Sequence, residues 1–132
     1  TKAPPTITFL GTGQKIIFRG LDDPLKLKSI KTRRGYFGLC WFEEAPEMYP
    51  EDIRSVLQSV MRGGESFRIF YSFNPPKMAS NWVNQEFLIP HPNKYTLKTT
   101  YLDVPRDWLG DAFFGEAERL KKEHSVHAEF HP

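Results

Sequence analysis

Hydrophobic and polar positions alternate at residues 6–10 near the start of the chain, and a second short run with apolar residues, 15–19, follows after two glycines. A period of two is typical of β-strands, and glycine tolerates the backbone angles of a tight turn. The two runs are therefore predicted to form a β-hairpin.

A continuous apolar run at residues 37–42 ends in two adjacent acids, Glu43 and Glu44, and a proline turn. A short run of this kind is typical of a strand buried in a parallel sheet. Open α/β folds bind ligands at the carboxyl ends of such strands, so the two acids are candidates for a binding site. An ordinary core strand whose acids cap the next helix accounts for the same pattern, and this alternative stays open.

The hydrophobic period changes after the acids. Apolar residues between positions 53 and 61 recur three and four apart, which predicts a helix that ends at Gly63 and Gly64. A short helix or turn is predicted at 24–30, helices at 80–88 and 107–123, and strands at 67–73 and 95–102. Strands that alternate with helices favour a three-layer α/β fold with a mainly parallel sheet and the hairpin at one edge.

The strand predicted at residues 67–73 also ends in polar residues, because it contains Ser72 and is followed by Asn74 and two prolines. The carboxyl ends of neighbouring parallel strands meet at one edge of a sheet, so these side chains are expected beside Glu43 and Glu44. There they can contact a phosphate through hydrogen bonds, although serine and asparagine are also common turn residues.

The composition indicates one folded domain, with 132 residues of which 39% are hydrophobic and 14% aromatic. The single cysteine, Cys40, cannot form an internal disulfide, which favours a reducing, cytoplasmic location. No apolar run has the length of a membrane span, so no membrane partner is expected. The net charge of +2 is too small to indicate a polyanionic partner by itself.

Basic residues are concentrated just before the central strand, at Lys26, Lys28, Lys31, Arg33 and Arg34. Such a cluster is usually a solvated surface, but it also suits contact with phosphate groups. Two further functions therefore stay open: a non-catalytic nucleic-acid-binding module that uses this cluster, and a metal-dependent hydrolase that uses Glu43 and Glu44 directly. The hydrolase is the weaker alternative, because adjacent residues on a strand face opposite sides of the sheet.

Four segments carry a resemblance to a known family, namely GQKIIFRGLDDPLKLKS, YFGLCWFEEAPEM, FRIFYSFNPP and TTYLDVP. In this order and spacing they look like the large terminase subunits of tailed bacteriophages and prophages, of the PBSX-like group, and the resemblance extends to about Lys122. It implies an ATPase of the P-loop NTPase type that drives double-stranded DNA into a preformed capsid. It also implies ATP and Mg²⁺ as cofactors, and the portal protein, the small terminase subunit and further copies of the chain as partners.

The resemblance implies a role for each candidate residue. Glu43 takes the metal-binding place of the Walker B strand, and Glu44 takes that of the catalytic base. Ser72 and Asn74 match the motif that couples hydrolysis to movement. Arg33 or Arg34 lies where several relatives carry an arginine finger that acts on a neighbouring subunit.

The chain departs from the family pattern at several points. The phosphate-loop pattern GxxxxGK[ST] is absent, and GTGQK at residues 11–15 does not replace it, because the spacing differs and a strand follows. The C-terminal nuclease domain is absent, and Val104 stands where many relatives have asparagine. Residues 1–132 are therefore expected to be the C-terminal part of the ATPase domain, an excised segment or a prophage remnant, with little or no ATP turnover alone.

Overall fold

The computed structural model describes residues 3–21, 32 and 34–129. Contacts divide the chain into two compact units, Thr1–Pro90 and His91–Pro132. The short helix or turn predicted at residues 24–30 lies outside the described residues.

The first unit begins with the predicted β-hairpin. Strands β1 (Thr6–Thr8) and β2 (Lys15–Ile17) pair antiparallel, with Ile7 opposite Ile16. Gly13 adopts a φ of 72° in the connecting turn, a conformation that glycine accepts without steric strain. The hairpin is confirmed, and a strand follows GTGQK as predicted. The expected place of the hairpin is wrong for the described residues, because β1 and β2 form a sheet of their own.

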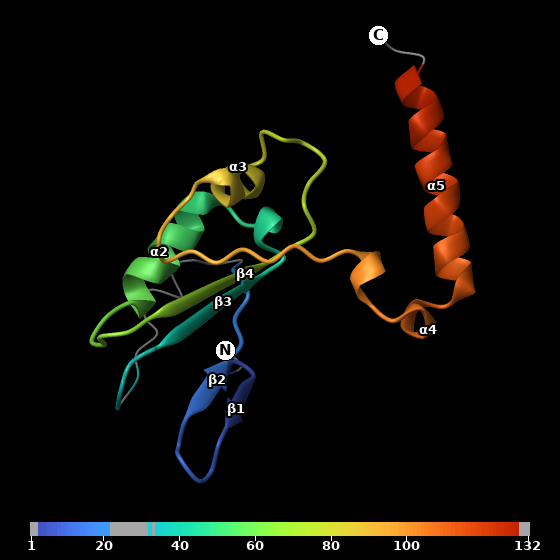
Figure 1. The fold of residues 1–132 in the computed structure, drawn as a ribbon. Coiled ribbons are helices and arrows are strands. Elements are labelled where there is room, and N and C mark those ends of the chain that lie inside the picture. The colour runs from blue at the N-terminus through green and yellow to red at the C-terminus, as the bar shows by residue number, and fades with distance from the viewer. Residues whose placement is uncertain (1–2, 22–31, 33, 130–132) are drawn as a thin grey trace. The chain divides into compact units, whose positions relative to one another are not determined.

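The second sheet is a parallel pair of strands joined by a helix (Figure 1). Strands β3 (Leu39–Glu43) and β4 (Arg68–Ser72) pair in a register that sets Leu39 opposite Arg68 and Glu43 opposite Ser72. Between them lie the 3₁₀ turn η1 (Ala45–Glu47) and helix α2 (Pro50–Val60). The predicted strand–helix–strand unit is therefore confirmed. In the part of the chain that the structure describes this sheet has two strands, so a larger three-layer sheet is not formed there.

Helix α2 covers one face of the β3–β4 pair (Figure 1). Pro50 stands at its start, where no amide donor is needed, and Glu51 and Asp52 in the first turn complement the positive end of the helix dipole. Among the described residues, the buried hydrophobic side chains come from β3, η1, α2 and α3 (Trp82–Leu88), and they are Phe42, Ala45, Ile53, Val56, Val60 and Val83.

Helix α3 (Trp82–Leu88) joins this core through Val83 and fixes the loop that follows β4. Asn81 caps the helix by accepting a hydrogen bond from the backbone N–H of Val83 at 3.1 Å. The Asn84 side chain donates to the carbonyl of Pro76 at 2.9 Å, so the proline segment after β4 is tied to the helix.

In the part of the chain that the structure describes, the opposite face of the β3–β4 pair is open. Leu39, Trp41 and Phe70 lie on it with 57%, 63% and 46% of their surfaces exposed. The prediction that the apolar run is buried on both faces is therefore wrong in this structure, because every second residue of β3 has no cover among the described residues. Parallel sheets are ordinarily covered on both faces, so this side is suited to packing against further polypeptide.

The second unit differs from its prediction in two places. Residues 95–100 form no strand, and η2 (Tyr101–Asp103) follows, because the Thr100 hydroxyl and the Asp103 carboxylate form a capping box. The helix predicted at 107–123 is divided into α4 (Arg106–Leu109) and α5 (Asp111–Glu129) by Gly110, whose φ is 79°. Asp107 lies in the first turn of α4, and the N-cap position belongs to Pro105.

The second unit is held by an aromatic cluster. Tyr101 makes edge contacts with Phe113 and Phe114, with ring centroids 5.9 and 5.7 Å apart, and the Arg106 guanidinium lies 4.4 Å from the centre of the Phe114 ring. Phe113 and Leu120 stay largely exposed, at 45% and 42%. Within the described ranges, no helix is both long enough and apolar enough to cross a membrane.

Candidate functional site

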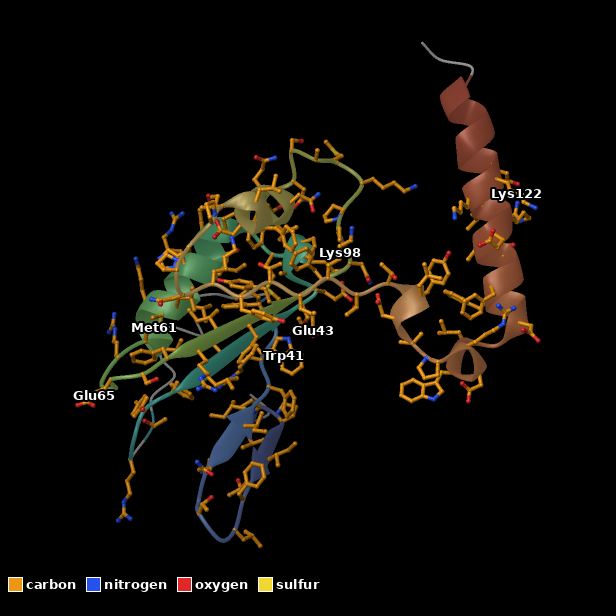
Figure 2. The ribbon with its side chains drawn as sticks, in the orientation of Figure 1. Trp41, Glu43, Met61, Glu65, Lys98 and Lys122 are labelled. Carbon is orange, nitrogen blue, oxygen red and sulfur yellow. The ribbon has the colours of Figure 1, made fainter. Side chains whose placement is uncertain are left out.

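The carboxyl ends of β3 and β4 bring Glu43 and Ser72 together. The two residues are opposite each other in the parallel register, and the Ser72 hydroxyl donates a short hydrogen bond to Oε2 of Glu43. The Trp41 indole Nε1–H donates to the same Ser72 oxygen at 2.7 Å. Figure 2 labels Trp41 and Glu43 where they lie along β3. An acid and a hydroxyl therefore meet at the sheet edge where the sequence predicted a site.

The chemistry of this trio follows from its donors and acceptors. An indole nitrogen only donates, an ionised carboxylate only accepts, and a serine hydroxyl does both. The Ser72 proton is thus directed to Glu43 while its oxygen accepts from Trp41. A hydrogen bond to a carboxylate is charge-assisted and stronger than a neutral one, so this contact fixes the Glu43 side chain firmly for an exposed residue.

Glu44 leaves the strand in an unusual conformation. Its φ of 53° and ψ of 46° lie in the left-handed helical region, which residues with a Cβ atom rarely adopt. Ala45, the next residue, is fully buried, and η1 begins there. The alternation of strand residues therefore ends at Glu43 and does not determine the direction of Glu44. Strain in a non-glycine residue beside a candidate site is a recurrent feature of functional positions.

Replacing Glu44 by glycine is expected to stabilise the fold. The left-handed conformation costs an L-residue about 1–2 kcal/mol, whereas the added chain freedom of glycine offsets about 0.4–1 kcal/mol. The net gain should be about 0.5–1 kcal/mol in the free energy of unfolding, measured by urea denaturation. The matched control is Glu47→Gly in η1, where glycine should destabilise, and equal effects at both positions would contradict strain at Glu44.

The remaining predicted residues are not gathered at this edge. Asn74 is exposed and lies two residues beyond the carboxyl end of β4. Arg34 is exposed in the bend before β3, so it adjoins the amino end of the strand and not the carboxyl end. The structure does not bring Arg34 to Glu43, and its proposed action on a neighbouring subunit stays a prediction. The other residues of the basic cluster lie outside the described residues, and they are Lys26, Lys28, Lys31 and Arg33.

The residues at this edge can hold a cation only in part. In the described part of the chain, no group of three or more acidic, histidine or cysteine side chains is close enough to hold a metal ion. Mg²⁺ in nucleotide sites is bound by one or two carboxylates, with substrate phosphates and water completing six ligands. Glu43, with Oε2 engaged by Ser72, suits that partial role and does not suit a protein-only metal cage.

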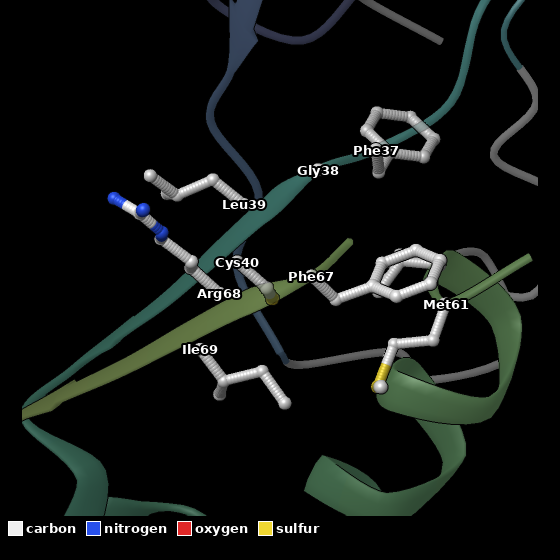
Figure 3. Close-up of a pocket in the computed structure, with 9 residues that line it drawn as sticks. Phe37, Gly38, Leu39, Cys40, Met61, Phe67, Arg68 and Ile69 are labelled. Carbon is white, nitrogen blue, oxygen red and sulfur yellow. The ribbon is translucent and has the colours of Figure 1, made fainter. Parts of the chain in front are cut away.

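The opposite end of the strands carries a small apolar depression (Figure 3). Phe37, Cys40, Met61 and Phe67 are among the residues that line it, and it encloses no volume for a ligand. Burial raises the pKa of the Cys40 thiol, so this cysteine is a poor nucleophile at neutral pH. The depression is therefore a packing feature of the fold.

Trp41 is the member of the site that sequence reasoning missed. It stands inside the apolar run and was assigned to the core with its neighbours. The available signal was its spacing, because residues two apart on a strand share a face, so Trp41 lies on the side of Glu43. An indole there can reach the polar end of the neighbouring strand, as it does in the contact with Ser72.

Comparison with known proteins gives two matches. The family model described as phage terminase large subunit matches residues 1–130. A curated relative, the terminase large subunit of Bacillus phage SPP1, is 38% identical over 134 residues, which cover 96% of this chain. The aligned segment is 31% of that relative, so the chain spans about a third of its length.

Proposed function

This chain belongs to the phage terminase large subunit family, and from that membership we propose that it forms part of a DNA-packaging ATPase. The observation that carries the proposal is the parallel pairing of β3 with β4, which joins Glu43 to Ser72 at the carboxyl ends of adjacent strands. Open α/β folds bind their ligands at this edge. The proposed complete fold is a P-loop NTPase sheet to which these strands contribute the Walker B half.

Each residue has a role in the proposed reaction. Glu43 would hold the cation, and Glu44 would orient and polarise the water that attacks the γ-phosphate. Ser72, at the end of β4, and Asn74, two residues beyond it, form the coupling motif at the phosphate end of the nucleotide, and Arg33 or Arg34 reaches the nucleotide of a neighbouring subunit. Mg²⁺ bound with ATP supplies positive charge at the β- and γ-phosphates. The phosphate loop is contributed by polypeptide outside these 132 residues, so the chain alone should not turn over ATP.

The open face of the β3–β4 pair agrees with such an arrangement. Leu39, Trp41 and Phe70 are apolar and exposed there, and a P-loop NTPase sheet is covered by helices on both sides. In the proposed motor the partners are double-stranded DNA, the portal protein, the small terminase subunit and other copies of the large subunit. The proposed location is the bacterial cytoplasm.

A chimaera tests the proposal. In the SPP1 large subunit, the aligned segment is replaced by this chain, which is 38% identical to it. The chimaera is expected to hydrolyse ATP at a rate within about tenfold of the parent. Catalysis of phosphoryl transfer depends mainly on the positions of the catalytic groups, and the graft should keep these positions. The measurement is the release of inorganic phosphate with saturating Mg·ATP.

A second chimaera, with Glu43→Ala, provides the matched control for the graft. It should fold equally well, because Glu43 is exposed, and it should lose turnover. Folded chimaeras that both lack turnover, or that both keep it, would contradict the proposed site.

A further inference from the structure

We propose that Trp41 is a positioning residue for Glu43, and that its indole N–H acts through the Ser72 hydroxyl. The inference rests on the proposed function, in which Glu43 faces the nucleotide-bound cation. Trp41 Nε1 donates to Ser72 Oγ at 2.7 Å, and Ser72 Oγ in turn donates to Glu43 Oε2. The three side chains form one continuous series of hydrogen bonds across two strands.

Sheet geometry fixes the series. Trp41 and Glu43 are two residues apart on β3 and therefore share a face, while Ser72 lies directly opposite Glu43 on β4. Trp41 also lies opposite Phe70, with ring centroids 6.4 Å apart. The indole is thus held on one side by the Phe70 ring, and its N–H is free to reach the end of the strand.

The direction of these hydrogen bonds follows from the number of protons that each group can donate. A serine hydroxyl has one proton, and an indole N–H cannot accept that proton. By occupying the Ser72 oxygen as a donor, Trp41 leaves Ser72 a single strong option, which is donation to the Glu43 carboxylate. Without the indole, the hydroxyl can rotate toward water, and Glu43 loses the contact that limits its rotamers.

One consequence concerns the division of roles on β4. While Ser72 donates its only proton to Glu43, it has no proton for a phosphate oxygen. Asn74, whose amide carries two protons and whose side chain is exposed, then becomes the phosphate contact in this arrangement. Ser72 then orients the Glu43 carboxylate, as hydrogen-bond partners of metal ligands orient those ligands in other proteins.

The alternative explanation is that the Trp41 ring only packs on the open face and has no role in orienting Glu43. Trp41→Phe separates the two explanations, because phenylalanine keeps an aromatic ring against Phe70 and removes only the N–H donor and part of the ring area. Trp108→Phe is the matched control, since Trp108 is 76% exposed in the second unit.

The first measurement uses this chain and needs no nucleotide. In ¹⁵N–¹H spectra, the indole resonance of Trp41 is expected to move on Ser72→Ala, which removes the oxygen that accepts from the indole, and on Glu43→Gln, which changes the group that accepts from that hydroxyl. The indole resonance of Trp82, which donates to the Met48 carbonyl at 3.0 Å, should stay in place. A Trp41 resonance that ignores both variants would overturn the proposal.

The second measurement uses the chimaera and varies Mg²⁺ at saturating ATP. Trp41→Phe should raise the half-saturating Mg²⁺ concentration about tenfold, as removal of an outer-sphere partner commonly does, with little change in the KM for ATP. Ser72→Ala should have a similar effect, and the double variant should be no worse than either, because the two residues act in series. Additive effects, or no change in the Mg²⁺ dependence, would overturn the positioning role.

The two proposals fail in different ways. A folded chimaera without turnover contradicts the proposed function, and the indole resonances still decide whether Trp41 positions Glu43. Full turnover with an unchanged Mg²⁺ dependence in Trp41→Phe contradicts the positioning role and leaves the proposed function standing.

Discussion

Replacing Glu44 by glutamine in the chimaera is expected to reduce ATP turnover by about a hundredfold or more. Glutamine keeps the size of the side chain and its hydrogen-bonding capacity but cannot take a proton from the attacking water. General bases contribute about 10²–10⁴ to the rates of such steps, so the loss should lie in kcat. The KM for ATP should change little, because Glu44 is not assigned to nucleotide binding.

Glu47→Gln is the control for this substitution. Glu47 is an exposed acid in η1, three residues after Glu44, and it has no assigned role. It should keep turnover within about twofold, since surface substitutions of this type rarely perturb structure. If Glu44→Gln retained the parental kcat in a folded chimaera, the catalytic base would have to be another residue.

Replacing Phe42 by alanine is expected to destabilise the first unit by about 3–5 kcal/mol. Phe42 is 5% exposed, and its ring stacks on Tyr71 with centroids 5.3 Å apart. The described core is small, so there are few other apolar side chains to close the cavity. A loss of this size is a large part of the 5–15 kcal/mol that is typical of whole domains, and it should unfold the unit at low urea concentration.

Leu39→Ala is the matched control on the same strand. Leu39 faces the open side of the sheet and is 57% exposed, so its truncation should cost about 1 kcal/mol or less. Urea denaturation followed by circular dichroism measures both variants. Similar losses at the two positions would contradict the assignment of Phe42 to the covered face and Leu39 to the open one.

Local patterns predicted the elements of the first unit well. The local sequence carries each of these signals within a few neighbouring residues: the alternation at residues 6–10, the short apolar run within 15–19, the helical spacing from Ile53 to Val60 and the proline after β4. The meeting of Glu43 with Ser72 was also predictable, because it follows from parallel pairing of consecutive strands.

The failures concern information that is not local. The apolar run at 37–42 does not reveal which of its faces the described chain covers, because the same apolar residue types can be buried or exposed. Thr100 and Asp103 favour a local capping box over strand pairing, and Gly110 supplies the left-handed break between α4 and α5. The contact of Trp41 with Ser72 requires the register of two strands, which no single segment contains.

Glu43 and Glu44 are adjacent in sequence but belong to different structural elements. Glu43 is fixed by the β3–β4 ladder, whereas Glu44 begins the turn into η1. Helix α3 contacts η1 directly, and Trp82 donates its indole N–H to the carbonyl of Met48, just after the turn. A displacement of α3 would therefore move the backbone of Glu44, while Glu43 stays in place with the sheet. The backbone angles φ and ψ at Glu44 then form a hinge through which the movement of α3 can change the spacing of the two carboxylates.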